Sequence, residues 1–334
     1  MTAVAVIGDG QMGLVLADAL VCRGMDVRLW GPFEDKVTDL AMSRKSPRLS
    51  EFTLDESVLV TSDGNSALSG ADVAINAIPT QFIRGVWEDL ASNVPSGIPI
   101  ACVAKGIEIE TQMLPTQIIE ASLLSGHTTC VLSGPTIATE LVRRQPAVMV
   151  SSSSDDGVAS TIQDLFDVPW LRIYTHGDPL GVELAGALKN VIAVAAGICD
   201  GMKLGDNAKS AMLARGLAEI ARLGVAMGAQ LETFFGIAGV GDLATTCFSP
   251  YGRNRTCGER LGKGEKLDEI TSSMGSVVEG VPTTKAVKVL SEQYDVDMPI
   301  AATMHEVLFG GLEIQDAIVA LMSRDLRAEQ LRHT

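Results

Sequence analysis

The sequence predicts an α/β fold, with a doubly wound, mostly parallel sheet in an N-terminal domain and an all-α C-terminal domain. In the first half, short β-branched runs alternate with helical segments, a pattern typical of a parallel sheet covered on both faces. A glycine-rich turn follows the first of these runs at residue 8. In the second half only helical periodicity remains. We therefore expect one domain over residues 1–178 and another over residues 179–334.

The expected strands are the short apolar runs Ala3–Ile7, Val27–Trp30, Asp72–Ile78, Ile98–Ala104, Thr128–Leu132 and Ala147–Ser151. Helical patterns between them include Met12–Arg23 and Phe82–Ala91. The run WLRIYT, which ends at Thr175, closes this part of the chain. The helices expected after it are Val182–Gly201, Ala208–Met227, Arg253–Gly262, Thr283–Tyr294 and Ile300–Phe309.

The composition excludes several classes of protein. With 46% hydrophobic and 20% charged residues, the chain can form real cores and is not disordered. Its net charge of −15 argues against nucleic acids and anionic membranes as partners, because there is no general positive field. An anionic substrate would need a local cluster of cations and helix N-termini. Thirty-three glycines against three tryptophans and three tyrosines indicate close packing of backbones.

The cysteines and histidines give no sign of a metal site. Cysteines 22, 102, 130, 199, 247 and 257 form no CxxC pair, so we expect small buried side chains in a reducing, cytoplasmic compartment. His127, His176 and His305 are isolated. The N-terminus has no basic segment typical of a signal peptide. The apolar stretch Leu180–Cys199 contains Glu183 and Lys189, and we expect it to be too short and too charged to span a bilayer.

The turn Gly8-Asp9-Gly10-Gln11-Met12-Gly13 is a G-x-G-x-x-G motif between a strand and a helix. The first glycine permits the tight turn, the second lets a pyrophosphate approach, and the third lets helix and strand pack closely. The free N–H groups and the dipole of the helix would hold the anion. The alternative is a glycine-rich turn without a ligand, but the position in a βαβ unit favours a Rossmann-like domain that binds NAD(H) or NADP(H).

The second strand leaves the choice between NAD and NADP open. An acidic residue at its end would bind the ribose 2′-hydroxyl, and an arginine would favour the 2′-phosphate. This chain has Pro32 and Phe33, then Glu34 and Asp35, with Lys36 as the first cation. Because the acids come first, we expect NADH to be used at least as well as NADPH.

Four polar segments interrupt apolar surroundings and are candidates for the chemistry. They are Lys105-Gly106-Ile107-Glu108 and Ser133-Gly134-Pro135-Thr136 after strands, Lys189-Asn190 inside a helix, and Gly239–Asp242 followed by Gly252–Arg255. Lys189 shares a helix face with Ala193, Ala196 and Asp200, so a ligand could approach it closely. A role without chemistry is also open for the charged residues. Lys105, Asp242, Arg253 and Arg255 could be solvated surface charges, and Lys189 could bury its methylene groups while its ammonium reaches water.

Together these segments resemble the bacterial NAD(P)-dependent glycerol-3-phosphate dehydrogenases. The resemblance runs from Val4 to about Lys285 and rests on the motifs LWG, KGIE, SGPTIATE, GALKNVIAVAAGICDG, GVGDL with TTC, GRNR and VVEGVPT, in that order. It implies a Rossmann domain, a helical domain and reversible reduction of dihydroxyacetone phosphate to sn-glycerol 3-phosphate for phospholipid synthesis. It also implies a small phosphorylated substrate, and we further expect a homodimer in the cytoplasm without a metal.

The resemblance assigns roles to individual residues. Lys189 would be the catalytic acid/base, with Asp242 orienting it. Residues implied to line the substrate are Lys105, Gly134, Thr136, Lys189, Asp242, Arg253 and Asn254. Residues implied to contact the dinucleotide are Gly8, Gly10, Gln11, Met12, Gly13, Lys105, Ala138, Arg253, Val277 and Glu279.

The chain departs from the family pattern at three places. Gln11 and Met12 stand where the family has serine and an aromatic residue, and Pro32 stands where it has histidine or arginine. Gly252 replaces a serine, which removes one hydroxyl near the substrate. Two rival functions follow: a ketopantoate- or hydroxyacid-type reductase with no phosphate requirement, and a dinucleotide-binding regulator without catalysis. Intact Lys189 and Asp242 speak against the second.

Overall fold

A computed structural model describes residues 1–123 and 126–325 and divides the chain into two compact units. The first unit contains residues 1–104 and 114–179. The second contains Lys105–Met113 and residues 180–325. The sequence pattern predicts a single division after residue 178 and does not foresee that Lys105–Met113 packs with the helical part.

The first unit is built around a sheet of eight strands in the order β3-β2-β1-β4-β5-β6-β7-β8. All neighbouring strands are parallel except β6 and β7, which are antiparallel. This confirms the expected doubly wound, mostly parallel sheet. The strands are β1 (Ala3–Ile7), β2 (Asp26–Trp30), β3 (Leu59–Thr61), β4 (Val73–Asn76), β5 (Ile100–Cys102), β6 (Thr129–Ser133), β7 (Ala147–Ser152) and β8 (Leu171–His176).

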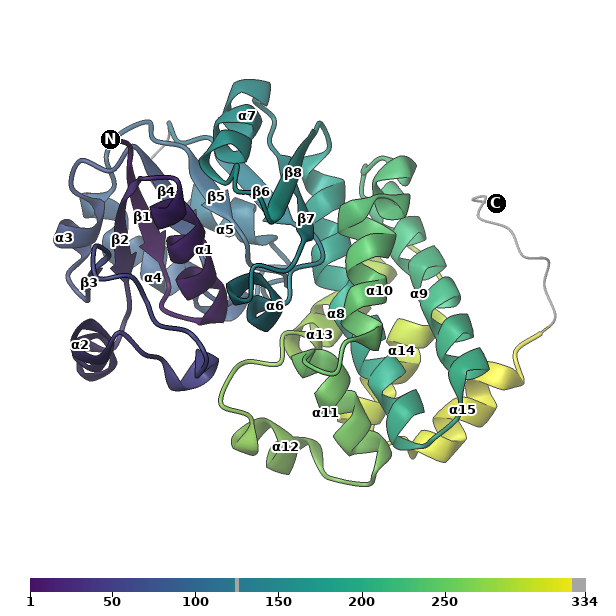
Figure 1. Cartoon of the computed structure of the whole chain (residues 1–334). Helices are drawn as coiled ribbons and strands as arrows, with labels where there is room; N and C mark the ends of the chain where they lie inside the picture. Colours follow the sequence, from purple (N-terminus) through teal and green to yellow (C-terminus); the bar gives the residue numbers. More distant parts are fainter. Residues whose placement is uncertain (124–125, 326–334) are drawn as a thin grey trace. The chain divides into compact units, whose positions relative to one another are not determined.

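Helices cover both faces of this sheet. Helix α1 packs beside α6, and α4 packs beside α5 on the opposite face (Figure 1). The buried strand residues Val4, Val6 and Ile75 share one apolar cluster with Leu16 and Leu20 of α1. The helices of this unit are α1 (Gln11–Cys22), α2 (Glu34–Ser43), α3 (Gly64–Leu68), α4 (Ile83–Leu90), α5 (Pro115–Ser122), α6 (Ala138–Val142) and α7 (Asp156–Leu165).

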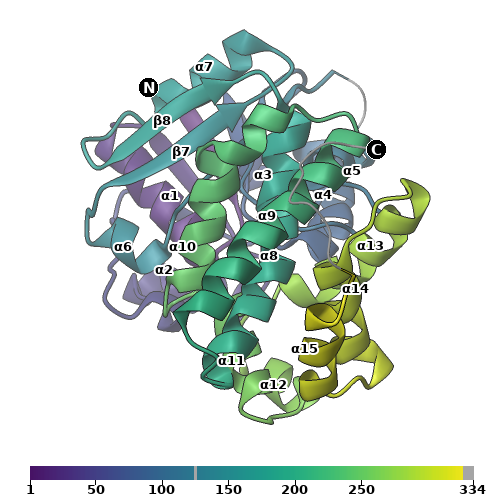
Figure 2. The same cartoon turned by 90° about the vertical axis from the view of Figure 1, so that its right-hand side faces the viewer.

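The second unit is helical, as expected, and α8 runs through it among α9, α11 and α14 (Figure 2). Two π-helical turns, Ile237–Gly241 and Glu306–Gly310, lie directly before α10 and directly after α14. The α-helices are α8 (Pro179–Gly201), α9 (Asp206–Ala226), α10 (Asp242–Phe248), α11 (Arg253–Gly262), α12 (Leu267–Ser273), α13 (Gly280–Gln293), α14 (Pro299–His305) and α15 (Ile314–Met322).

Helices α8 and α11 approach each other through glycines on both sides. A side-chain carbon at Gly258 would lie 1.9 Å from the carbonyl oxygen of Val194 on α8. At Gly197, Gly201 and Gly262 such a carbon would lie 2.0 to 2.6 Å from a backbone oxygen of the facing helix. Only glycine fits at these four positions, because backbone cannot move aside as a side-chain tip can. The expectation of close backbone packing is confirmed here.

The length and hydropathy of α8 correct one expectation. The described residues contain one helix that is long and apolar enough to cross a membrane, Pro179–Gly201, with 23 residues and a mean hydropathy of 1.6 over its best window. The expectation that this stretch is too short and too charged is therefore wrong. All residues of that window are buried inside the protein, and α8 is the central helix of the second unit.

The described cysteines are all free, and all except Cys22 are buried. The expectation of small buried side chains is thus confirmed for the other positions and wrong for Cys22, which lies at the end of α1.

Candidate active site

The glycine-rich turn after β1 has the geometry that its sequence predicts. Gly8 has φ of +123°, and a side-chain carbon there would lie 2.8 Å from the backbone of Ala77. A side-chain carbon at Gly13 would lie 1.8 Å from the carbonyl oxygen of Gly8. At Gly10, by contrast, a side-chain carbon would meet no atom within 4 Å. The first and third glycines are therefore required by the protein itself, while the second leaves open space.

The open space at Gly10 lies at the N-terminus of α1, where a dinucleotide phosphate would fit. Gly10 is the N-cap, and it has no side chain to satisfy the first N–H groups of the helix. Those groups have no partner within the helix, and the helix dipole favours an anion there. A pyrophosphate can approach such a backbone closely. The residues present therefore fit a dinucleotide.

The side chains around this turn contain a cation that the sequence does not single out. Arg48, in a short 3₁₀ turn, lies 3.5 Å from the carboxylate of Asp9. The side-chain amide of Gln11 donates a hydrogen bond to the carbonyl oxygen of Arg48 at 2.5 Å. A side-chain carbon at Gly31, directly after β2, would lie 3.0 Å from the carboxylate of Asp9. Asp9 and Arg48 are thus held beside the end of β2, where the ribose 2′ position is read in this type of fold.

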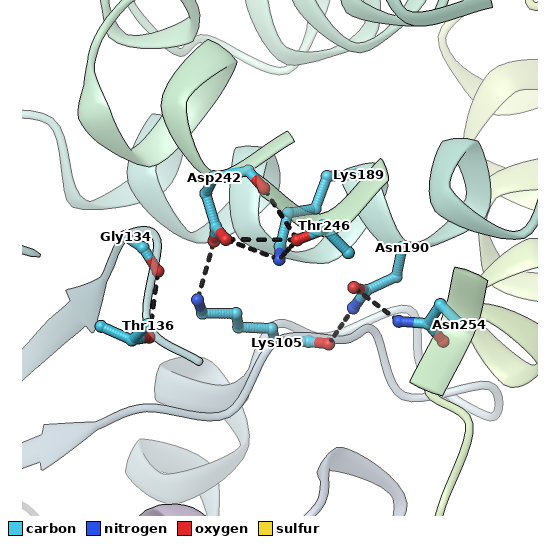
Figure 3. Close-up of polar contacts among 8 residues, drawn as sticks. All are labelled: Lys105, Gly134, Thr136, Lys189, Asn190, Asp242, Thr246 and Asn254. Carbon is cyan, nitrogen blue, oxygen red and sulfur yellow. Dashed lines mark hydrogen bonds and ion pairs between the residues drawn. The ribbon is translucent and has the colours of Figure 1, made fainter. Parts of the chain in front are cut away.

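In the second unit, Lys189 lies in the middle of α8 with 6% of its side chain exposed. Its ammonium group donates to Oδ1 of Asp242 at 2.8 Å and to the hydroxyl of Thr246 at 2.5 Å (Figure 3). An ammonium group has three N–H donors. Two of them are used by described residues, so the third can be offered to a ligand.

The local fold explains how Asp242 reaches this position. Asp242 is the first residue of α10 and follows the π-helical turn Ile237–Gly241. A side-chain carbon at Gly239 would lie 2.0 Å from the carbonyl oxygen of Phe234, so the turn needs glycine there. A carboxylate in the first turn of a helix is favoured by the helix dipole. Thr246, one turn later, donates its hydroxyl to the carbonyl oxygen of Asp242 at 2.7 Å.

Asp242 also binds the second lysine of the site. Its Oδ2 accepts a hydrogen bond from Lys105 at 2.7 Å, while Oδ1 accepts one from Lys189 (Figure 3). The Asp242 side chain is 3% exposed and that of Lys105 is 20% exposed. Two ammonium groups on one carboxylate leave a net charge of +1. This cluster supplies a local positive charge in an acidic protein.

Burial and charge set the protonation of the cluster. Burial and, to a smaller extent, the charge of Lys105 lower the pKa of Lys189 to about 8, although the charge of Asp242 opposes them. Burial alone would raise the pKa of Asp242, but the charges and hydrogen bonds of Lys105 and Lys189 hold it below its usual value. Lys189 is therefore mostly an ammonium at pH 7 and can lose its proton within one pH unit or so. Such a group suits proton transfer near neutral pH.

The other predicted site residues lie in both units. Thr136 donates its hydroxyl to the carbonyl oxygen of Gly134 at 3.1 Å, in the first unit, where Ala138 begins α6 (Figure 3). Arg253 is exposed at the start of α11, and Val277 and Glu279 precede α13, all in the second unit. Met12 packs against the core of the first unit. The roles that the resemblance gives these residues stay predictions.

Asn254 makes contacts that its predicted role does not require. Its Nδ2 donates to Oδ1 of Asn190 at 2.8 Å, and its Oδ1 accepts the N–H of Gly280 at 2.9 Å. Asn190 in turn donates to the carbonyl oxygen of Lys105 at 2.8 Å. The substrate contact expected for Asn254 stays a prediction.

Sequence reasoning missed Thr246 and Arg48 as members of a site, and it placed Asn190 in a candidate segment without giving it a role. Thr246 could have been found, because it lies four residues after Asp242 on a helix and so shares its face. Asn190 follows Lys189 but carries no signal of its own, and Arg48 comes close to Asp9 only through the fold.

Comparison with known proteins agrees with this geometry. Residues 3–159 match the family described as NAD-dependent glycerol-3-phosphate dehydrogenase N-terminus, and residues 178–319 match its C-terminus. The chain belongs to the NAD-dependent glycerol-3-phosphate dehydrogenase family. Members of this family use NAD(H) or NADP(H), which fits the open space at Gly10 at the start of α1.

Relatives within this family cover the whole chain. A glycerol-3-phosphate dehydrogenase (NAD(P)+) of Staphylococcus haemolyticus is 44% identical over 332 residues, which are 98% of this chain and 100% of the relative. A crystal structure of glycerol-3-phosphate dehydrogenase from Coxiella burnetii, at 30% identity, has a TM-score of 0.93 and covers 97% of this chain and 99% of its own.

A structure of ketopantoate reductase from Ralstonia eutropha is more distant. It has a TM-score of 0.61 at 13% identity, with 92% of this chain and 97% of its own covered. That likeness shows a shared fold alone, so the rival of a ketopantoate-type reductase has less support than membership of the glycerol-3-phosphate dehydrogenase family.

Proposed function

We propose that this chain catalyses the reversible NAD(P)H-dependent reduction of dihydroxyacetone phosphate to sn-glycerol 3-phosphate, the backbone of glycerophospholipids. The observation that carries the proposal is the buried Lys105–Asp242–Lys189 cluster in a member of this family. A regulator without catalysis has no need of a buried ammonium group with a free donor and a pKa near neutrality. The cluster therefore supports an enzyme.

Lys189 acts as the proton donor to the ketone. Negative charge develops on the carbonyl oxygen during reduction, and the third N–H of Lys189 stabilises and then protonates it. A reduced nicotinamide, when bound, supplies the hydride. In the reverse direction the neutral amine of Lys189 accepts the hydroxyl proton. Asp242 and Thr246 hold the amine in place through both directions.

The substrate phosphate is attracted by cations of the second unit. Lys105 and Lys189 both bind the single carboxylate of Asp242, so their cluster keeps one positive charge. Arg253 is exposed at the N-terminus of α11. Charge-assisted hydrogen bonds to phosphate are about twice as strong as neutral ones. The local positive charge can thus bind a dianion although the chain carries −15 overall.

The proposed phosphate site predicts a strict requirement for the phosphate. We expect turnover of dihydroxyacetone phosphate and little turnover of dihydroxyacetone at the same concentration, because the latter cannot use the cations. Oxidation of NADH and NADPH, followed by absorbance, measures kcat/KM for both substrates. Equal values of kcat/KM would rule out the phosphate site, and turnover of ketopantoate alone would favour the rival reductase.

The end of β2 predicts the choice of cofactor. We expect NADH to be used at least as well as NADPH, because the Asp9 carboxylate lies beside Gly31 and would repel a 2′-phosphate. The ratio of kcat/KM for the two cofactors tests this, together with their dissociation constants from protein-fluorescence titration. A strong preference for NADPH would refute it. Arg48→Ala would then show whether the cation that pairs with Asp9 binds the 2′-phosphate, with Lys36→Ala as the comparison.

We further infer a homodimer in the cytoplasm. The support is the family membership and the six cysteines, which form no disulfide among the described residues. Light scattering of the purified chain measures the oligomeric state.

A further inference from the structure

Two arginines lie in the first turn of α11, and the structure gives them different surroundings. Arg253 is exposed at the start of the helix. The side chain of Arg255 is only 14% exposed, and its Nε lies 2.6 Å from Oδ2 of Asp200 near the end of α8. Residues two apart in a helix do not share a face. Arg255 therefore contacts α8, while Arg253 lies on another side of α11.

Asp200 is also held by Lys209 of α9. The Lys209 ammonium donates to Oδ1 of Asp200 at 2.9 Å and to Oδ2 at 2.7 Å, and 8% of its side chain is exposed. Nη1 of Arg255 lies 3.3 Å from the carboxylate of Glu259, one turn later on α11. We name Asp200, Lys209 and Arg255 the anchor triad. It joins α8, α9 and α11, all within the second unit.

The contact between α8 and α11 needs such an anchor. Its shortest approaches are made by glycines, and a side-chain carbon at Gly197 would lie 2.0 Å from the carbonyl oxygen of Arg255. Interlocking side chains normally fix how two packed helices are turned and shifted against each other. The glycines offer no such side chains, so polar contacts must fix the rotation and the shift of α11.

Two neighbouring residues of α11 supply polar contacts at distant points of α8. Asn254 donates to Oδ1 of Asn190 at 2.8 Å (Figure 3), and Arg255 pairs with Asp200. Asn190 and Asp200 are about 15 Å apart along the axis of α8, from the rise of an α-helix. Contacts at two such points fix the angle of the first turn of α11 as well as its position. The anchor triad supplies one of the two.

We propose that Arg255 is a positioning residue, which together with Asp200 sets the first turn of α11 so that Arg253 meets the phosphate of the substrate. The inference rests on the proposed function, in which Arg253 attracts that phosphate. Arg255 itself pairs with Asp200 and Glu259 and does not bind the substrate. Asp200, although it is an acid, then raises the affinity of the protein for an anion.

The sign of this effect separates positioning from direct binding. If Arg255 bound the phosphate, Asp200 would compete for it, and removal of the acid would leave the affinity for an anion unchanged or raise it. General electrostatics acts in the same direction, because the chain becomes less negative. If Arg255 positions the turn, Asp200→Asn and Arg255→Met both release it, and both lower the affinity.

The test is calorimetric titration with sn-glycerol 3-phosphate in the presence of NADH, a combination that cannot react. In Arg255→Met and in Asp200→Asn we expect the dissociation constant to rise ~10-fold or more, the scale of one lost hydrogen bond to a charged group. The double variant should rise no further, because both substitutions break one contact. Arg255→Lys should recover most of the affinity, since an ammonium can still pair with Asp200.

The matched control is Arg260→Met on the same helix. The partners of Arg260 are Glu265 and Ser273, which follow α11 in the chain and do not belong to α8. This variant loses an arginine and an ion pair of α11 without releasing the first turn from α8. We expect its dissociation constant for sn-glycerol 3-phosphate to equal that of the wild type.

Turnover gives a second readout. In Arg255→Met the KM for dihydroxyacetone phosphate should rise ~10-fold while kcat changes less than ~3-fold, because the phosphate is bound alike in the ground state and the transition state. A general loosening of the second unit would lower kcat as well. If Asp200→Asn does not fold because Lys209 loses its partner, Asp200→Asn is combined with Lys209→Met, which removes the buried ammonium.

Three outcomes decide the matter. Unchanged or higher affinity in Asp200→Asn, beside a loss in Arg255→Met, would make Arg255 a direct ligand of the phosphate and overturn the inference. Unchanged affinity in both variants would leave the anchor triad a role in stability alone. If the affinities fall as expected but the wild type does not turn over dihydroxyacetone phosphate, the positioning role stands and the proposed function falls.

Discussion

Lys189→Met is expected to lower kcat for dihydroxyacetone phosphate reduction by ~10²-fold or more, the usual scale for losing a positioned acid/base. Methionine keeps most of the volume of lysine and removes the charge and the donors. Asp242 keeps Lys105 as a partner, so its carboxylate is not left unpaired in the interior. We therefore expect the variant to fold and to bind NAD(H) much as the wild type does. Steady-state kinetics and a cofactor titration measure both.

The matched control for this substitution is Lys209→Met. Lys209 is also buried, and its ammonium group contacts both carboxylate oxygens of Asp200, at 2.9 and 2.7 Å. The Lys209→Met variant loses a buried ion pair but no proton donor. Its kcat therefore shows how much of the effect of Lys189→Met comes from the lost ion pair alone. Wild-type kcat in Lys189→Met would remove Lys189 from the chemistry. A raised KM with kcat preserved would mean that Lys189 only binds the phosphate.

Two further results are expected for Lys189, one for a substitution and one for the dependence of kcat on pH. Lys189→Arg should also fail, because a guanidinium group is wider and has a pKa above ~12. In the wild type, reduction needs the ammonium form, so kcat for reduction should fall as the pH rises through the Lys189 pKa of about 8. Oxidation of glycerol 3-phosphate needs the neutral amine, so its kcat should rise over the same interval. Identical pH profiles in the two directions would contradict this assignment.

Gly258→Ala is expected to destabilise the protein by about 3 kcal/mol or more, at the upper end of what overpacking costs. The new carbon would lie 1.9 Å from the carbonyl oxygen of Val194, and that oxygen belongs to the backbone of α8. The two helices must separate to admit it. Since Asn254 lies in the first turn of α11 and donates to Asn190, which follows Lys189 on α8, the separation should also lower kcat. Urea unfolding followed by circular dichroism measures the change in stability.

The control is Gly85→Ala in α4. A side-chain carbon at Gly85 meets no atom within 4 Å, and the residue lies inside a helix. Alanine there should be neutral or stabilising by up to ~1 kcal/mol, from helix propensity. If Gly258→Ala proves as stable as the wild type, the close approach of α8 and α11 does not require glycine at this position.

The elements with strong apolar patterns could be predicted from the sequence, and those without could not. The predicted range of β1 is the observed one, Ala3–Ile7, because all five residues are buried. Strand β3 has three residues and no fully buried side chain, so it offers no period to detect. Strand β8 alternates buried and exposed residues over its first half, and its run WLRIYT marks only the end of the pattern. The reversed direction of β7 has no local signal at all.

The site shows the same division. Lys189 could be predicted as functional because a charge inside an apolar helix needs a partner or a task. The partner itself, Asp242, lies 53 residues away, and its position depends on a π-helical turn. The hydrogen bonds of Asn254 to Asn190 and Gly280 could not be predicted, because an amide that binds protein and an amide that binds substrate look alike in a sequence. Transfer of Lys105–Met113 to the second unit depends on contacts with segments that come later in the chain.

The apolar character of α8 has a consequence for biosynthesis. The chain leaves the ribosome N-terminus first, so Pro179–Gly201 emerges before the segments that cover it. Helix α11, which packs on α8 through glycines, ends at Gly262, about sixty residues after the end of α8. Helix α13, whose Gly280 also contacts α8, is made later still. Over that interval the nascent chain exposes a segment with the length and hydropathy of a membrane span. Two events therefore compete during synthesis. Either α9 to α13 are made in time to cover α8, or a factor that binds apolar nascent segments binds α8 first.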